Sequence, residues 1–147
     1  MPINLLVAWT WILLGFVSGF CLGLGFHREN WLGGYASLKR RLYRLGHISL
    51  FALGAINLFF YLTADHLHAG GIAWAIASWA FVAGAVSMPM CCLIMAHVPK
   101  ARLLFAVPVL SLLTAGAATL AGIIAFQQSS ISGLDHLSVT IPHPLSR

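Results

Sequence analysis

The sequence predicts an all-α integral membrane protein: an antiparallel bundle of four transmembrane helices with both termini on the outer, periplasmic side. Composition is the first reason. Of the 147 residues, 60% are hydrophobic and only 7% are charged, and the mean hydropathy is +0.91. A soluble domain carries about 25% charged residues, so this composition cannot cover a surface that faces water. The other two reasons are four long apolar runs and a strong asymmetry in the placement of Lys and Arg.

Residues 5–26 form the first predicted span. The run carries no charge, and it exceeds the about 20 residues that a helix needs to cross a bilayer core. Within it, Gly15, Gly19 and Gly23 recur at every fourth position. On a helix they form a strip without side chains, against which another helix can pack closely. That helix belongs either to this chain or to another membrane subunit, including a second copy in a homo-oligomer.

The connection from residue 27 to residue 45 is the most charged part of the chain. It holds Arg28, Lys39, Arg40, Arg41 and Arg44 against one acid, Glu29. From position 35 to position 45 the apolar residues share one helical face and the basic residues the other. This pattern predicts either a short interfacial helix on an anionic leaflet or an extension of the second span beyond the membrane.

The remaining spans are predicted at about residues 46–64, 71–97 and 103–126, which completes a transmembrane domain over residues 1–126. Pro89 lies inside the third span and should kink it, because proline cannot donate a hydrogen bond to the carbonyl of Ala85. Residues 127–147 are polar and include Pro142 and Pro144. They are predicted to form an irregular periplasmic tail.

The orientation follows from the basic residues. Seven of the eight Lys and Arg residues lie in the first and third connections, which are therefore expected in the cytoplasm. This pattern suits a multi-pass protein of a bacterial inner membrane. The net charge of +5 is then a topology signal, and no nucleic-acid partner is expected. The chain has three acidic residues and none lies in a span, which excludes catalysis by paired carboxylates there. No hydrolytic or nucleophilic motif occurs, so any catalysis would be redox chemistry through a bound cofactor.

The best candidate for a cofactor ligand is His47, at the cytoplasmic end of the second span. Gly54 lies seven residues further on the same face and could leave a flat slot beneath the imidazole, and Arg40 and Arg44 lie above it. A ligand histidine, a glycine that admits a macrocycle and cations that pair propionates suit haem b. His97 on the next span is the expected second axial ligand, with His27 as an alternative. Haem b sites of four-helix membrane cytochromes share this architecture, which is an analogy of fold.

Two other groups of residues suggest metals. Outside the membrane, Asp65, His66 and His68 together with Asp135, His136 and His143 of the tail offer ligands for zinc or copper. Within the third span, Met88, Cys91, Cys92 and Met95 form a stripe at helical spacing. Thioether and thiolate groups such as those of Met88, Cys92 and Met95 select Cu(I). Core packing is the competing and favoured interpretation of this stripe, since Met and Cys also fill apolar interiors.

Three functions remain open at this stage. The first is a haem-b-binding electron-transfer protein or a subunit of a respiratory complex. The second is a membrane protein that handles copper. The third is an accessory subunit without a cofactor, which packs against a larger complex.

Overall fold

The computed structural model describes the backbone of residues 2–139 and the side chains of residues 2–98 and 100–131. Within this part of the chain there are four long α-helices, two short 3₁₀ segments and no strand. The elements are α1 (Pro2–Gly25), η1 (Trp31–Gly33), α2 (Leu38–His66), α3 (Ile72–His97), η2 (Pro99–Phe105) and α4 (Ala106–Val139). All four α-helices are long and apolar enough to cross a membrane. The prediction of an all-helical chain with four helices long and apolar enough to span a membrane is therefore confirmed.

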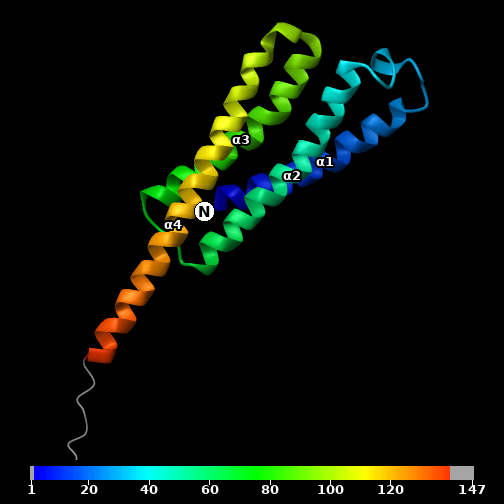
Figure 1. The fold of residues 1–147 in the computed structure, drawn as a ribbon. Helices are drawn as coiled ribbons and strands as arrows, with labels where there is room; N and C mark the ends of the chain where they lie inside the picture. Colours follow the sequence, from blue (N-terminus) through cyan, green and yellow to red (C-terminus); the bar gives the residue numbers. More distant parts are fainter. Residues whose placement is uncertain (1, 140–147) are drawn as a thin grey trace, which may run out of the picture.

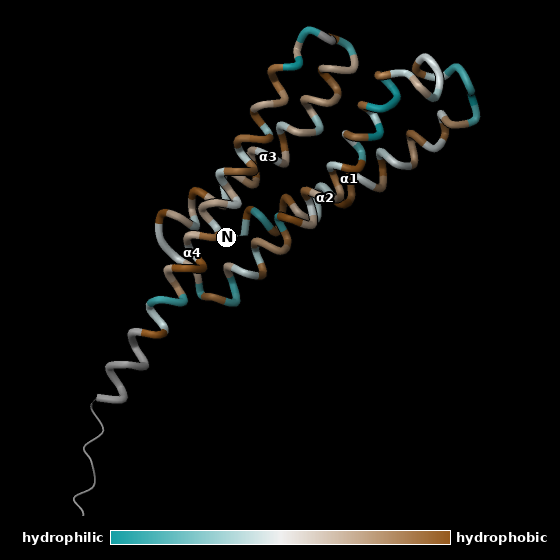
Figure 2. Tube along the Cα trace, viewed as in Figure 1, coloured by the Kyte–Doolittle hydropathy of each residue, from teal (hydrophilic) through white to brown (hydrophobic). Residues whose placement is uncertain are grey.

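The helices form two antiparallel hairpins that join through α2 and α3. α1 packs on α2, α2 on α3 and α3 on α4, whereas α1 contacts α3 only slightly. The two hairpins diverge towards the ends that carry the α1–α2 and α3–α4 connections (Figure 1). Hydrophilic residues concentrate at the connections, and the helices between them are largely hydrophobic (Figure 2).

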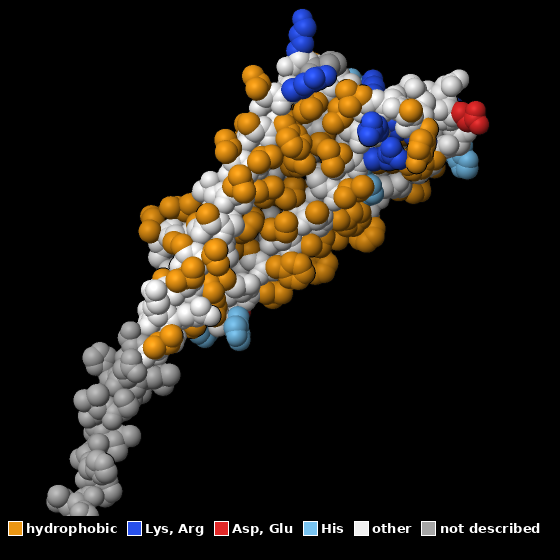
Figure 3. Space-filling view, in the orientation of Figure 1, with side chains coloured by type: hydrophobic (Ala, Val, Ile, Leu, Met, Phe, Trp, Pro, Cys, Tyr) orange, Lys and Arg blue, Asp and Glu red, His pale blue; other side chains and the backbone are white. Residues whose placement is uncertain are grey.

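The Lys and Arg residues of the described part of the chain gather at one end. The space-filling view shows Lys and Arg side chains around the α1–α2 and α3–α4 connections and none along the helices below on that face (Figure 3). The antiparallel order of the helices brings both basic connections to this end, as the predicted topology requires. We refer to it as the basic end.

The second span begins earlier than its apolar run. α2 starts at Leu38 and continues through Gly46 without a break, so of the two predicted alternatives the extended second span is the observed one. Ser37 is the N-cap: its Oγ accepts a hydrogen bond from the Arg40 backbone N–H at 3.2 Å and donates one to the Leu32 carbonyl at 2.6 Å. Such a cap satisfies one of the N–H groups that a helix leaves unpaired at its start.

The predicted irregular tail is wrong for its first part. α4 continues as a helix from the span through Gln127 to Val139. Polar residues such as Gln and Ser lower helix propensity only slightly, and no proline occurs in this stretch before Pro142. The two prolines on which the prediction depended lie outside the described residues.

The carbonyl that Pro89 leaves unpaired has a partner from another helix. The Trp11 indole Nε1 on α1 donates to the Ala85 carbonyl oxygen on α3 at 2.8 Å. An unsatisfied carbonyl inside a membrane is costly, so this contact compensates for the missing proline N–H. The sequence predicted the free carbonyl but not the indole that binds it.

A buried polar cluster joins three helices in the interior, and the sequence analysis did not anticipate it. Asn4 of α1, Asn57 of α2 and Ser78 of α3 are at most 1% exposed. The Asn4 side-chain amide donates to Asn57 Oδ1 at 3.0 Å and to the Ser78 carbonyl at 3.2 Å, and Ser78 Oγ donates to Asn4 Oδ1. Hydrogen bonds between polar side chains stabilise helix association in membranes.

Candidate functional site

The glycine strip of α1 is covered by α2 of the same chain. A Cβ added at Gly15 would lie 2.8 Å from the Phe51 ring, and one added at Gly19 would lie 2.8 Å from His47 Cε1. The strip therefore provides two slots, for Phe51 and for the His47 imidazole, whose rings meet edge to face at 5.4 Å. At Gly23 nothing lies within 4 Å of an added Cβ. Of the three strip glycines, only Gly23 remains open to another helix.

His47 is held by a hydrogen bond to Ser18 of α1. Its Nδ1 lies 2.9 Å from Ser18 Oγ, and this hydroxyl donates to the Gly15 carbonyl at 3.0 Å. A serine hydroxyl has one proton to donate, so when that proton goes to the Gly15 carbonyl, the Ser18 oxygen accepts the N–H of Nδ1 from a neutral His47. Its Nε2 then carries a free lone pair, as in histidines that bind metals or accept hydrogen bonds from ligands.

Beside His47 lies a small crevice between α1, α2 and α3, with a volume of about 220 Å³. Its walls are mostly apolar. The lining residues are Ser18, Cys21, Leu22, Tyr43, Gly46, His47, Leu50, Pro89 and Leu93. Cys21 and Leu93 are exposed on the outside of the bundle, so the crevice opens towards the outer surface of the helices. Four of the lining residues carry polar side chains, namely Ser18, Cys21, Tyr43 and His47, but nearly all of the lining surface is apolar.

Tyr43 connects the crevice to the basic end. It lines the crevice one helical turn above His47, and its hydroxyl lies 3.0 Å from Nε2 of His97 on α3. His97 itself is exposed. The structure thus brings His97 to the same end as His47, but at the level of Tyr43, about 6 Å further along α2.

The predicted haem slot is closed. A Cβ added at Gly54 would lie 3.0 Å from the Ala8 carbonyl oxygen and 3.3 Å from Trp11 Cβ, so α1 occupies the space beneath His47 that the prediction assigned to a macrocycle. The crevice of about 220 Å³ is smaller than the about 300–1,000 Å³ of pockets for drug-sized ligands, and a haem is larger still. Together with the bond between His97 and Tyr43, this means that a haem b between His47 and His97 does not fit the described conformation.

Arg40 and Arg44 lie among aromatic rings at the start of α2. The Arg40 guanidinium carbon is 5.0 Å from the centre of the Phe26 ring and 5.3 Å from that of Tyr35, and Arg44 is 4.8 Å from the same Tyr35 ring. Arg40 is only 5% exposed. Neither guanidinium lines the crevice beside His47.

The sulfur stripe of α3 divides among different contacts. Met88 packs against the cluster of Val7, Leu53 and Ala85, and Cys92 is fully buried with its Cβ 3.4 Å from a Cβ added at Gly46. Cys91 Sγ contacts Met95 Sδ at 3.6 Å. The predicted copper ligands Met88, Cys92 and Met95 therefore have separate neighbours, as packing side chains do.

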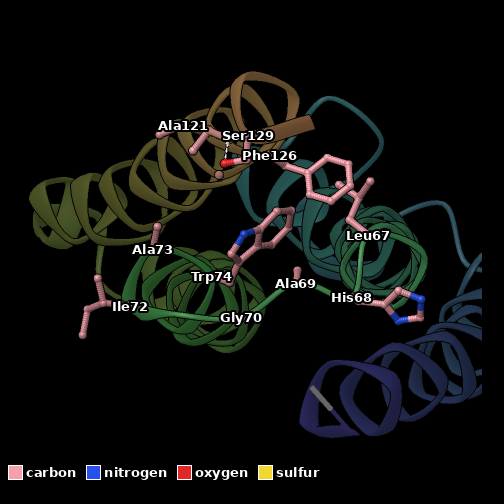
Figure 4. Close-up of a pocket in the computed structure, with 12 residues that line it drawn as sticks. Leu67, His68, Ala69, Gly70, Ile72, Ala73, Trp74, Ala121, Phe126 and Ser129 are labelled. Atoms are coloured by element: carbon pink, nitrogen blue, oxygen red, sulfur yellow. Dashed lines mark hydrogen bonds between the residues drawn. The ribbon is translucent and has the colours of Figure 1, made fainter. Parts of the chain in front are cut away.

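The outer group of predicted metal ligands is not assembled by the described residues. Asp65, His66 and His68 are exposed, and within the described part of the chain no three His, Cys, Asp or Glu residues could share a metal ion. Figure 4 shows a pocket between the α2–α3 connection and α4, with Trp74 at its centre, and the His68 imidazole points away from Trp74. The side chains of Asp135 and His136, and all of His143, lie outside the described residues.

Sequence reasoning missed Ser18 and Tyr43, the two hydrogen-bond partners nearest to the predicted histidines. Ser18 does stand directly before Gly19, so a polar residue beside the glycine strip was a usable signal. Comparison with protein-family models, with curated proteins and with solved structures finds no match for this chain.

Proposed function

We propose that this chain is a subunit of a membrane electron-transfer complex and that the crevice beside His47 binds the head group of a quinone or quinol. The observation that carries the proposal is the Ser18–His47 hydrogen bond at the wall of an apolar crevice open towards lipid. It leaves His47 Nε2 as an acceptor for a quinol hydroxyl. The proposed location is a bacterial inner membrane with the basic end in the cytoplasm.

The size and polarity of the crevice favour this class of ligand. A volume of about 220 Å³ admits a single substituted ring. The opening between Cys21 and Leu93 lets an isoprenoid tail remain among the lipid chains. Binding sites of this kind combine apolar walls with a few oriented polar groups, which here are His47 and Tyr43.

The same residues offer a route for protons. Oxidation of a quinol releases protons and electrons, and the His47 lone pair accepts a proton from the hydroxyl that it binds. Tyr43 and His97 are hydrogen-bonded to each other at 3.0 Å and lead from the crevice wall to the exposed basic end. The electrons would pass to a redox centre of another subunit.

The test is quinone binding by the purified full-length chain. A short-tailed ubiquinone analogue is titrated while tryptophan fluorescence is followed, and the Ser18→Ala variant is compared with the wild type. Loss of one hydrogen bond of about 1 kcal/mol should weaken binding about 5-fold, because the His47 ring loses its orientation. Ser87→Ala is the matched control, since Ser87 makes the same kind of bond to its own helix, with Ala83 at 2.7 Å.

The optical spectrum of the same preparation separates the alternatives. A Soret band that disappears in His47→Ala would identify haem b as the occupant and overturn the quinone assignment. Stoichiometric copper that is lost in Cys91→Ser would support copper handling through the Cys91–Met95 contact. A colourless, metal-free protein with equal quinone affinity in the Ser18→Ala and Ser87→Ala variants would contradict the quinone site. The remaining alternative would then be an accessory subunit without a cofactor.

A further inference from the structure

We propose that the basic end of α2 binds the phosphate group of an anionic phospholipid, with Arg40, Arg44 and Arg41 as its cationic partners. This inference does not depend on the quinone proposal. It starts from Arg40, whose side chain is 5% exposed and whose Nε is buried without a hydrogen-bond partner among the described residues. An N–H group that is buried without a hydrogen-bond partner is costly, so the buried Nε of this cation points to an acceptor that the described residues do not supply.

The described part of the protein surrounds the Arg40 guanidinium with aromatic rings and not with an acidic side chain. The Arg40 guanidinium carbon lies 5.0 Å from the Phe26 centroid, 6.0 Å from that of Trp31 and 5.3 Å from that of Tyr35. Cation–π contacts offset part of the cost of burial. The aromatic rings accept no hydrogen bond from the N–H groups in the plane of the guanidinium. These donors therefore remain available to an anion.

A second cation lies on the same ring. The Arg44 guanidinium carbon is 4.8 Å from the centre of the Tyr35 ring. Tyr35, Ala36, Arg41 and Arg44 line a hollow of about 340 Å³. Arg40 is not one of the lining residues, but its guanidinium lies on the Tyr35 ring that forms part of the wall. No ion pair links these arginines to a carboxylate within the described part of the chain. Like charges that converge on one ring repel each other unless an anion lies between or beside them.

The chemistry of the hollow matches a phosphate group. Guanidinium forks bind phosphate oxygens through paired N–H groups, and the hollow adjoins the N-terminal turn of the 29-residue helix α2, whose dipole favours an anion. Exposed apolar residues flank it: Tyr35 is 69% exposed and Leu38 52% exposed. This combination places the hollow at the boundary between acyl chains and head groups, where the phosphate belongs to a lipid.

The experiment compares the full-length protein in two kinds of nanodisc, one of phosphatidylcholine alone and one that also contains phosphatidylglycerol. The readouts are the thermal unfolding midpoint and the lipid that remains bound in native mass spectrometry. We expect phosphatidylglycerol to raise the midpoint of the wild type by about 3 °C or more and to remain bound. Arg44→Gln should lose both effects. Arg102→Gln, which removes an exposed cation of the same end outside the hollow, should keep them.

Two further arms make the result decisive. Arg40→Lys keeps the charge but removes the fork, and a reduced lipid effect in that variant supports bidentate binding. Inorganic phosphate added to phosphatidylcholine discs shows whether the bound phosphate group must belong to a lipid. The same rise in the unfolding midpoint would support the phosphate site but assign it to a soluble phosphate. No rise in the wild type, or an equal rise in Arg44→Gln and Arg102→Gln, overturns the proposal, because the basic end would then respond only to net charge.

Discussion

The hydrogen bond between Trp11 and the Ala85 carbonyl is the contact whose contribution can be isolated most cleanly. It exists because Pro89 has no N–H to offer that carbonyl, and its length of 2.8 Å is that of a good hydrogen bond. Trp11→Phe removes the donor but keeps an aromatic ring and the Cβ that lies against Gly54. We therefore expect Trp11→Phe to lower the free energy of unfolding by about 1 kcal/mol for the lost hydrogen bond. The smaller ring should lower it by a further few tenths of a kcal/mol.

The prediction becomes specific in a second background. In Pro89→Ala the new backbone N–H can satisfy the Ala85 carbonyl from within α3. In that background, Trp11→Phe should lower the free energy of unfolding only by the few tenths of a kcal/mol that result from the smaller ring. The double-mutant cycle should accordingly show a coupling free energy of about 1 kcal/mol between positions 11 and 89, whatever Pro89→Ala does by itself to the shape of α3.

The assay is reversible unfolding in mixed micelles or by steric trapping, with the free energy of unfolding measured for the four members of the cycle. Trp9→Phe is the control, because Trp9 is 60% exposed on the outside of α1 and should change the free energy little. Equal costs of Trp11→Phe in the two backgrounds would refute the reasoning, since the indole would then contribute only packing.

Two further predictions concern α1 and its neighbours. Gly19→Ala should displace the His47 ring, because the new Cβ would lie 2.8 Å from Cε1, and it should weaken both stability and quinone binding. Gly23→Ala, with open space around it, should change neither. Equal behaviour of the two variants would contradict the role of Gly19 as the slot for His47. Asn4→Leu and Asn57→Leu should each lower the free energy of unfolding by about 1–2 kcal/mol. The double variant should lower it by less than the sum of the two, because both residues share the 3.0 Å bond. Strict additivity would show that the bond contributes nothing.

The fold was largely predictable because its main determinants are local. A run of about 20 apolar residues selects a spanning helix by length and composition alone, and all four expected runs lie in helices of the structure. Boundaries were less predictable. The start of α2 at Leu38 depends on the Ser37 cap and the contacts of the basic residues. The continuation of α4 past Gln127 depends on the absence of a proline in that stretch.

The site was predictable only in part, because it depends on how the helices are rotated about their axes. A soluble helix shows which face is buried through its polar and apolar sides. These helices are apolar on nearly every face, so the sequence does not say whether Gly54 faces a cofactor or α1. The bond between Ser18 and His47 joins residues that are 29 positions apart, and that between Tyr43 and His97 joins residues 54 positions apart. Both depend on packing that no local pattern encodes.

α2 forms hydrogen bonds to its neighbours at three levels along its length, whereas α1 and α3 bond to each other directly through Asn4 and Trp11. Asn57 binds α1 near one end, His47 binds α1 in the glycine strip, and Tyr43 binds α3 above it. Arg40, one further turn along, is buried under the α1–α2 connection. The proposed quinone crevice and the proposed phosphate site therefore lie within about two turns of one helix. Because they use different residues, Arg44→Gln should remove the lipid effect while leaving quinone affinity unchanged, and Ser18→Ala should do the reverse.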